Sequence, residues 1–342
     1  MAKKTNTSHL SLGQEHPSVT LFRQYLRIRT VQPDPDYDAA IQFLEKMAGE
    51  LELQCQKVEV APGRVVTILT WPGTDPKLRS IVLNSHTDVV PVFEEHWSHN
   101  PFEAFKDARG LANPTDTFTV FYSERSPWWI RVKSSGKPGH GSRFIEDTAG
   151  EKLNKVITSI LEFREKEKQR LKLDPQLTLG AVTSVNLTML QGGVAFNVVP
   201  ADMDASFDFR IAPDVNLEAF EEQLRGWCQA AGDGVTYEFH QKWTEPRMTA
   251  TDTSDPWWAA FSGACSDMNM TLKPEIFPAA TDSRYLRAKG VPALGFSPMN
   301  QTPILLHDHN EFLNEAVFLR GIDIYTRLLP ALASVPALSA DS

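Results

Sequence analysis

Two short segments of the chain carry histidines in patterns that suit metal binding. In the first, His86 and Asp88 stand two residues apart after the apolar run Ile81–Leu83. Successive side chains of an extended strand point to opposite faces, so His86 and Asp88 are expected on the same side. A carboxylate beside a metal-binding histidine fixes its tautomer and raises its basicity. A loop histidine beside a turn-forming aspartate explains the same residues without a metal.

The second segment, Leu305–His309, places two more imidazoles after an apolar pair. Zinc sites in proteins are built from imidazole nitrogens, thiolates and carboxylate oxygens, so His307 is a candidate ligand. The competing interpretation is a solvated loop before a helix that starts near Glu311, with Asp308 or Asn310 as its cap.

Three further polar residues stand where they could bind a substrate. His140 lies in the glycine-rich turn 136–142, where glycine lets the backbone approach a ligand closely, although a simple connector accounts for it about equally well. Arg210 lies on the polar face of an alternating strand and could hold a carboxylate through two hydrogen bonds, or pair with Asp208 instead. Asn197 is similarly ambiguous.

The elements before His86 are predicted from the spacing of apolar residues. Two helices come first, with Ser18 as the cap of the first one, and three strands follow. The third strand is short, apolar and polar at its end, as a buried central strand of an α/β sheet is when it delivers side chains to the ligand-binding edge. The helices are expected over residues 19–28 and 37–51, and the strands over 57–60, 65–71 and 81–85.

The middle of the chain follows a different pattern. From Trp128 onward the order is β-α-β-β-α-β, which is a ferredoxin-like unit. Its clearest strand alternates an apolar face, with Phe207 and Phe209, against a polar face that carries Arg210. The elements of this unit are expected over 128–133, 151–171, 181–190, 203–211, 217–231 and 235–242.

Helical periodicity returns after this unit, so the first domain is predicted to be interrupted by the second and completed afterwards. A helix from 256, a short helix at 282–288, a strand at 292–296 and a closing helix over 311–329 are expected. The predicted organisation is a disordered tail (1–15), a discontinuous domain (16–124 and 246–342) and a smaller inserted domain (125–245).

Length and composition exclude several classes of protein. The chain has 342 residues and a formal net charge of −9, which argues against non-specific nucleic-acid binding because phosphate contacts need clustered Lys and Arg. No apolar run approaches the ~20 residues of a membrane span, and the first residues lack the apolar stretch of a secretory signal. Three widely spaced cysteines fit a reducing compartment. We therefore expect a soluble, cytoplasmic protein.

Taken together, five motifs resemble the M20 metallopeptidase family, and most closely its N-acyl-L-amino-acid amidohydrolases. The resemblance runs from about residue 16 to the end of the chain. The motifs are SHTDVVP (85–91), SGKPGHGSRF (135–144), GGVAFNVVPADMDASFDFR (192–210), PAATDSRY (278–285) and LLHDH (305–309). The resemblance implies an α/β fold in which a zinc-peptidase-like catalytic domain is interrupted by a ferredoxin-like lid that dimerises.

The resemblance also implies roles for six residues. His86 is expected to bind one of two zinc ions and Asp88 to orient it, while His307 binds the other zinc. His140, on the lid, is expected to reach the partner subunit's site and stabilise the developing oxyanion. The lid residues Asn197 and Arg210 are expected to hold the substrate carboxylate and neighbouring polar groups. The implied reaction is attack of a zinc-activated water on the amide of an N-acyl-L-amino acid, with a glutamate as base.

The sequence departs from the family between the HTD motif and the lid. In the family, this stretch supplies an aspartate that bridges the two zincs, a Glu-Glu pair and a further acidic ligand. Here Asp107 is followed within a few residues by Ala112, and a βαβ unit takes ~30 residues, so a deletion of about two units is expected. Two histidines cannot hold two catalytic zincs, each of which needs about three protein ligands. The sequence therefore predicts impaired or absent hydrolysis.

Three interpretations remain open from the sequence. The first is an amidohydrolase by descent that has lost this stretch. The second is a non-catalytic protein that keeps its lid and dimerises with a full-length partner. The third is a related M20 dipeptidase, which the match around His140 and Arg210 disfavours.

Overall fold

The computed structural model describes residues 15–107 and 117–338. Most of the tail expected over 1–15, the junction at 108–116 and residues 339–342 lie outside this described part. The chain divides into two compact units. Unit 1 takes its described residues from 1–117, 259–271 and 298–342, and unit 2 consists of 118–258 and 272–297. The domain boundaries expected from the sequence stay a prediction.

Unit 1 begins with two helices and a β-hairpin. These are α1 (Pro17–Leu26), α2 (Tyr37–Glu50), β1 (Gln54–Ala61) and β2 (Arg64–Thr70). The two strands pair antiparallel as a sheet of their own. The cap of α1 is not Ser18, as expected, but His16, whose Nδ1 accepts a hydrogen bond from the Ser18 N–H at 3.2 Å. The reason is that Pro17 occupies the first helical position, which moves the cap one residue earlier.

The strand predicted over 81–85 is wrong. The structure assigns no strand to these residues, and Val82 and Leu83 are 73% and 66% exposed instead of buried. An apolar run becomes a central strand only when strands pair with it on both sides, and the described part of unit 1 offers it none. Only Val89, just beyond the run, forms an isolated bridge with Val31.

The remaining elements in the described part of unit 1 are helical. They are the 3₁₀ turn η1 (Glu94–His96), most of α5 (Pro256–Asp267) and the closing helix α7 (Glu315–Ala333). Helix α7 contacts α1, and the rings of Phe22 and Phe318 stack with their centroids 4.7 Å apart. Asn314 caps α7 by accepting hydrogen bonds from the N–H groups of Ala316 and Val317. Among the described helices, none is long and apolar enough to cross a membrane.

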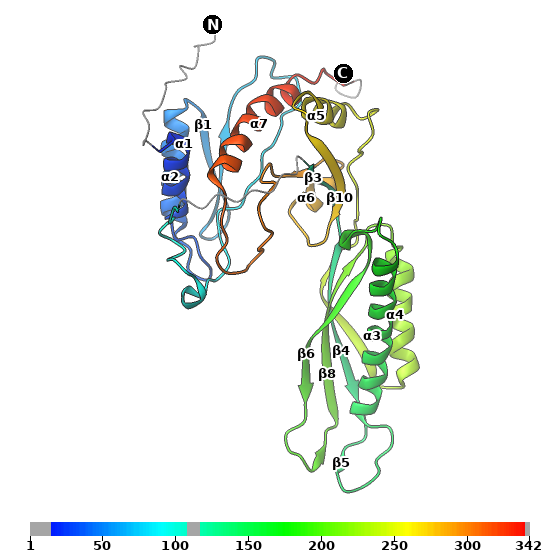
Figure 1. Cartoon of the computed structure of the whole chain (residues 1–342). Coiled ribbons are helices and arrows are strands. Elements are labelled where there is room, and N and C mark those ends of the chain that lie inside the picture. Colours follow the sequence, from blue (N-terminus) through cyan, green and yellow to red (C-terminus); the bar gives the residue numbers. More distant parts are fainter. Residues whose placement is uncertain (1–14, 108–116, 339–342) are drawn as a thin grey trace. The chain divides into compact units, whose positions relative to one another are not determined.

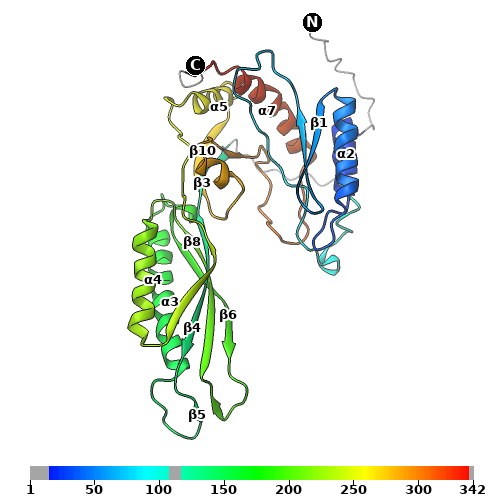
Figure 2. The ribbon, with the colours of Figure 1, turned by 180° about the vertical axis from the view of Figure 1, so that it is seen from behind.

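Unit 2 contains the predicted ferredoxin-like sheet. Its strands run in the order β6-β8-β4-β9, and all three pairings are antiparallel. Helices α3 and α4 lie side by side on one face of this sheet (Figures 1 and 2). The bounds are β4 (Ser126–Ser135), α3 (Ala149–Leu173), η2 (Leu179–Ala181), β6 (Ser184–Gly192), β8 (Asp202–Ile211), α4 (Leu217–Ala231) and β9 (Val235–Lys242).

The core of this layer confirms the predicted alternation of β8. Phe207 and Phe209 are almost fully buried, together with Trp128 of β4 and Leu224 of α4. Trp128 donates a hydrogen bond from Nε1 to the Trp243 carbonyl at 2.7 Å, so its one polar atom is satisfied inside the core. The sheet and its two helices therefore enclose a hydrophobic core of their own.

Two smaller sheets complete unit 2. One consists of β10 (Thr271–Phe277), β3 (Thr117–Glu124) and β11 (Gly295–Phe296), with α6 (Ser283–Ala288) following β10. No strand was expected at β10, and β11 is shorter than the strand expected over 292–296. The other sheet pairs β5 (Gly139–His140) with β7 (Val198–Val199).

Candidate functional site

In unit 1, His86 and Asp88 lie in contact. His86 Nδ1 lies 2.8 Å from the Asp88 carbonyl oxygen and 3.4 Å from its carboxylate Oδ1. Gln32 Nε2 donates a hydrogen bond to Asp88 Oδ2 at 3.0 Å. This hydrogen bond is the main cause that lowers the pKa of Asp88, and the neighbouring His86 lowers it further. An ionised Asp88 can therefore orient the His86 ring, although the ring itself is largely exposed.

His307 lies in an exposed turn of the same unit. Its backbone is left-handed, with φ +60°, and so is that of Asn310 at +58°. Asn310 ties this turn to the segment around η1, because its Oδ1 accepts a hydrogen bond from the Ser98 N–H at 2.7 Å. The same connection brings the rings of His309 and His96 to 5.0 Å between centroids. Thus the histidine turn is held by the 93–98 loop.

Metal binding needs several ligands at one point, and the described residues do not provide them. No hydrogen bond, ion pair or ring contact joins His86 and His307 in the described part of unit 1. Across the described residues, no group of three or more His, Cys, Asp or Glu side chains lies close enough to hold one ion. The donors present therefore do not fit a two-zinc site.

In unit 2, the short β5–β7 ribbon brings the His140 and Asn197 segments together. His140 is in register with Val198, and the Gly141 N–H donates a hydrogen bond to the Asn197 carbonyl at 2.9 Å. His140 Nδ1 lies 2.8 Å from Ser142 Oγ. The ribbon lies at one end of unit 2 (Figure 1). Two residues 57 positions apart in sequence thus share one exposed tip.

Arg210 of β8 pairs with Asp208 on the polar face of its own strand. Nε and Nη2 donate to the two carboxylate oxygens of Asp208 at 2.8 and 3.1 Å. Burial lowers the pKa of the neighbouring Arg125 to about 10, the Arg210 charge lowers it further, and Asp208 opposes both. Asp208 therefore neutralises a small arginine cluster, and Arg210 binds an anionic group only in competition with it.

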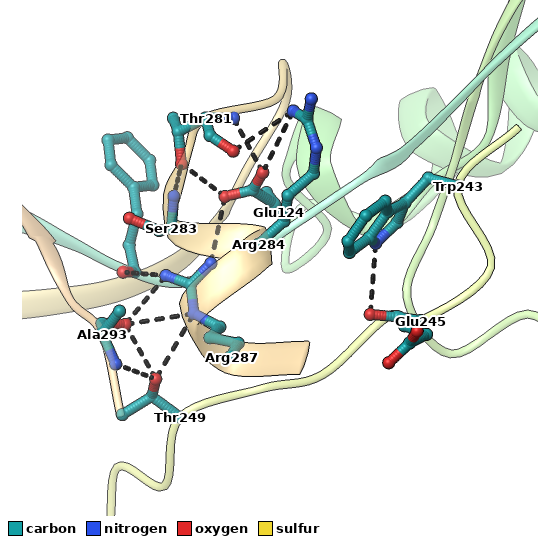
Figure 3. Close-up of polar contacts among 10 residues, drawn as sticks. Glu124, Trp243, Glu245, Thr249, Thr281, Ser283, Arg284, Arg287 and Ala293 are labelled. Atoms are coloured by element: carbon teal, nitrogen blue, oxygen red, sulfur yellow. Dashed lines mark hydrogen bonds and ion pairs between the residues drawn. The ribbon is translucent and has the colours of Figure 1, made fainter. Parts of the chain in front are cut away.

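A buried polar network of unit 2 was not expected from the sequence. The Glu124 carboxylate, on β3, accepts hydrogen bonds from the N–H and hydroxyl of Thr281 at 2.7 and 2.5 Å and from Arg287 Nη1 at 3.0 Å (Figure 3). Arg287 also donates to the Ala293 carbonyl, from Nη2 at 2.8 Å. The Thr249 hydroxyl donates to this same carbonyl at 2.7 Å. Four separate chain segments are joined at this point.

Arg284 lies beside this network and faces aromatic rings. Its guanidinium carbon lies 4.5 Å from the centroid of the Tyr285 ring and 5.5 Å from that of Trp243. Its Nη1 is 3.9 Å from Glu124 Oε1, and its buried Nε has no hydrogen-bond partner (Figure 3). The sequence signal for these residues was the motif PAATDSRY, which pointed to the segment but not to Glu124, its partner.

Three curated relatives resemble the chain over almost its whole length. Aminoacylase-1A of Rattus norvegicus is 62% identical over 400 aligned residues that cover 96% of this chain and 98% of the relative. Aminoacylase-1 of Homo sapiens gives the same identity over 401 residues and the same coverage. Aminoacylase-1 of Dictyostelium discoideum is 37% identical, covering 94% of this chain and 99% of its own. These alignments are longer than the 342 residues present, so the relatives contain residues without a counterpart here.

Other comparisons concern the fold. Residues 122–236 match the peptidase dimerisation domain of the M20 family. An M20 family metallo-carboxypeptidase from Sulfolobus solfataricus superposes with a TM-score of 0.68 at 14% identity, covering 94% of this chain and 100% of its own. A di-peptidase from Saccharomyces cerevisiae superposes with a TM-score of 0.59 at 14% identity, over 94% and 97%. The α/β fold with an inserted dimerisation domain, as expected, is therefore confirmed.

Proposed function

Because the chain belongs to the aminoacylase-1 family of the M20 metallopeptidases, we propose that it derives from an N-acyl-L-amino-acid amidohydrolase whose catalytic metal site it no longer assembles. The family reaction consumes one water. The water oxygen bonds to the acyl carbon, the amide C–N bond breaks, and a proton of the water passes to the nitrogen, so that a carboxylic acid and the amine of a free L-amino acid are released. We propose that this chain performs the reaction slowly or not at all.

One observation carries this proposal. No cluster of three metal-binding side chains exists among the described residues, although the two histidines expected as zinc ligands, His86 and His307, are present. The alignments with aminoacylases exceed the length of the chain, which supports an internal loss between Asp107 and Ala112. Zinc, when bound, would activate water and polarise the amide, but a zinc ion held by one or two imidazoles lacks the ligands of a catalytic site.

The six candidate residues keep the roles that the family motifs suggest. We propose that Asp88 orients His86, the remaining ligand of one zinc position, and that His307 belongs to the other. On the lid, His140 supports a developing oxyanion, and Arg210 with Asn197 binds the substrate carboxylate. The family motif supports the last assignment, and because Asp208 occupies Nε and Nη2 of Arg210, a substrate carboxylate has to compete with Asp208 or bind the remaining N–H groups.

The test is hydrolysis of N-acetyl-L-methionine by the purified full chain with added Zn²⁺, beside a full-length aminoacylase-1. Loss of the base alone lowers the rate by about 10²–10⁴-fold, and loss of metal ligands adds to this. His86→Ala is the control, since any turnover that it retains arises without the proposed site. Turnover similar to that of the full-length enzyme, and abolished by His86→Ala, would overturn the proposal.

A second function is favoured by the completeness of the lid. The match to a dimerisation domain and the closed core around Trp128 and Phe207 support dimerisation through unit 2, either as a homodimer or with a full-length aminoacylase. The test is co-expression with a tagged full-length enzyme. Co-purification together with reduced activity of that enzyme supports this function, and a strictly monomeric chain would contradict it.

A dipeptidase is the less favoured alternative. The dipeptidase from Saccharomyces cerevisiae shares only the fold at 14% identity, whereas aminoacylase-1A of Rattus norvegicus is 62% identical. Comparing cleavage of N-acetyl-L-methionine with cleavage of a dipeptide distinguishes the two substrates.

We also propose a cytoplasmic location, which is supported by three free cysteines, since thiols persist in a reducing compartment.

A further inference from the structure

Residues Ser80–Ser85 form an apolar segment that is exposed and unpaired, and we call it the unpaired segment. Its sequence, SIVLNS, contains no charged residue, no proline and no glycine. Val82 and Leu83 are 73% and 66% exposed. Adjacent residues of an extended segment point to opposite faces, so apolar side chains are available on both. An uncharged segment with apolar side chains on both faces is typical of a strand that is buried on both sides of a sheet.

The backbone of the unpaired segment is equally open. None of its N–H or C=O groups forms a hydrogen bond with the other described residues. The nearby hairpin does not cover it, because β1 and β2 form a two-stranded sheet in the described part of unit 1. Short segments of high β-propensity and low charge, once exposed without a partner, pair with strands of other chains.

We propose that the unpaired segment is an intermolecular β-pairing site and that its occupant is the same segment of a second copy of this chain. In an antiparallel pair related by a two-fold axis, the donors of each copy meet the acceptors of the other. A charged partner finds nothing to pair with here, since the segment itself carries no charge. The second copy has matching apolar residues on both faces.

The rest of the chain helps two copies to meet. Residues 122–236 match a dimerisation domain, and a dimer joined there would present two unpaired segments, each available to a further copy. Because the two interfaces are different, each copy can join two others, and assembly need not stop at a dimer. Growth of this kind is a property of this chain and does not depend on whether it hydrolyses N-acyl amino acids.

The net charge of the chain determines whether added salt strengthens or weakens this assembly. Each copy has a net charge of −9, so copies repel one another at low ionic strength. Added salt screens this repulsion but does not weaken an uncharged β-pairing. Assembly through the unpaired segment therefore strengthens with salt, whereas assembly through exposed ion pairs weakens.

The test measures the mass of the full chain by sedimentation velocity over a wide range of concentrations and at two salt concentrations. It is combined with hydrogen exchange of the amides of Ser80–Ser85. The proposal predicts a mass that grows with concentration and salt, and amides that become protected as the mass grows. Protection in dilute monomers, or no protection in the assembled chain, would overturn it.

Two variants separate the unpaired segment from other surfaces. Val82→Lys/Leu83→Lys is expected to remove the growth beyond the lid dimer and the amide protection. Leu51→Lys/Met248→Lys adds the same charge at positions that are 59% and 56% exposed, and should leave both unchanged. If both variants assemble like the original chain, or both lose assembly, the proposal is wrong. Circular dichroism checks that each variant is folded, and the exchange measurement on the original chain stands without them.

Discussion

Glu124 and Arg287 form an ion pair, with 3.0 Å between Oε2 and Nη1, in which the two side chains are only 6% and 3% exposed. Burial lowers the pKa of Arg287, and the charge and hydrogen bond of Glu124 oppose that shift. The two residues are 163 positions apart. Glu124 lies on β3, which precedes the ferredoxin-like layer in the chain, and Arg287 lies on α6, which follows it. Each partner keeps the other from being an isolated buried charge.

Removing one partner is therefore expected to destabilise unit 2 strongly. Arg287→Met leaves the buried Glu124 charge with only the more distant cation of Arg284, 3.9 Å away, and breaking a buried pair costs up to about 3–5 kcal/mol. Urea unfolding of the full chain measures the loss. Glu124→Gln/Arg287→Met removes both charges and should cost less than the sum of the two single changes. Additive single and double losses would show that the pair is not coupled.

The cap at the N-terminus of α3 is expected to contribute to the stability of unit 2. Thr148 and Glu151 form a capping box, in which the Thr148 hydroxyl accepts from the Glu151 N–H at 3.2 Å and Glu151 Oε2 accepts from the Thr148 N–H at 3.1 Å. Thr148→Ala should lower the stability of unit 2 by about 1 kcal/mol. Thermal unfolding at neutral pH measures this, and Thr148→Ser, which keeps the hydroxyl, should lose much less.

Glu151 makes part of this cap sensitive to acid. The hydrogen bond from the Thr148 backbone is the main cause that lowers the pKa of Glu151. A carboxylate with a lowered folded-state pKa contributes stability that is present above its unfolded pKa and lost as the pH falls through the folded value. The stability difference between the original chain and Glu151→Gln should therefore shrink between neutral pH and about pH 3. A difference that grows in acid would contradict the cap.

Two glycines of unit 2 should respond to alanine in opposite directions. A Cβ at Gly136 would collide with the backbone of Thr148 and Ala149, so Gly136→Ala is expected to destabilise by about 1–3 kcal/mol. Gly226, inside α4, has open space around that position, and Gly226→Ala should stabilise by about 0.5–1 kcal/mol. Denaturant midpoints of the two variants provide the comparison, and effects of the same sign would contradict this packing.

The cysteines predict a pattern of thiol reactivity. Cys55 is exposed, whereas Cys228 and Cys265 are buried, and burial raises the pKa of each buried thiol to about 11. The thiolate is the reactive form, so at pH 8 the buried pair should react slowly. A disulfide reagent should label one thiol rapidly in the folded chain and all three after unfolding. Cys55→Ser should abolish the rapid phase, and rapid labelling of all three in the folded chain would contradict the burial.

The ferredoxin-like layer could be predicted from the sequence because its apolar patterns are complete within it. Phe207 and Phe209 alternate as a half-buried strand does, and the helices that cover them show their own periodicity. β10 escaped prediction because Lys273, Pro274 and Glu275 interrupt its apolar residues. The ion pair of Glu124 and Arg287 could not be predicted from a local sequence pattern, because the two residues are 163 positions apart in the chain.

The candidate site was less predictable for a physical reason. The HTD motif identified His86 and Asp88, and the structure places them in contact. The run before them looked like a central strand, but a strand forms through hydrogen bonds with its neighbours, and the described part of unit 1 has none to offer it. The proposed internal loss would account for both the exposed segment and the absence of a metal-binding cluster among the described residues.

The zinc content of the purified chain tests the central claim most directly. The full chain is equilibrated with excess Zn²⁺, separated from unbound metal by gel filtration, and analysed for zinc and protein in the same fractions. The proposed loss of the metal site predicts well below one retained zinc ion per chain, with no change in His86→Ala or His307→Ala. One or two tightly retained ions per chain that disappear in these variants would contradict it.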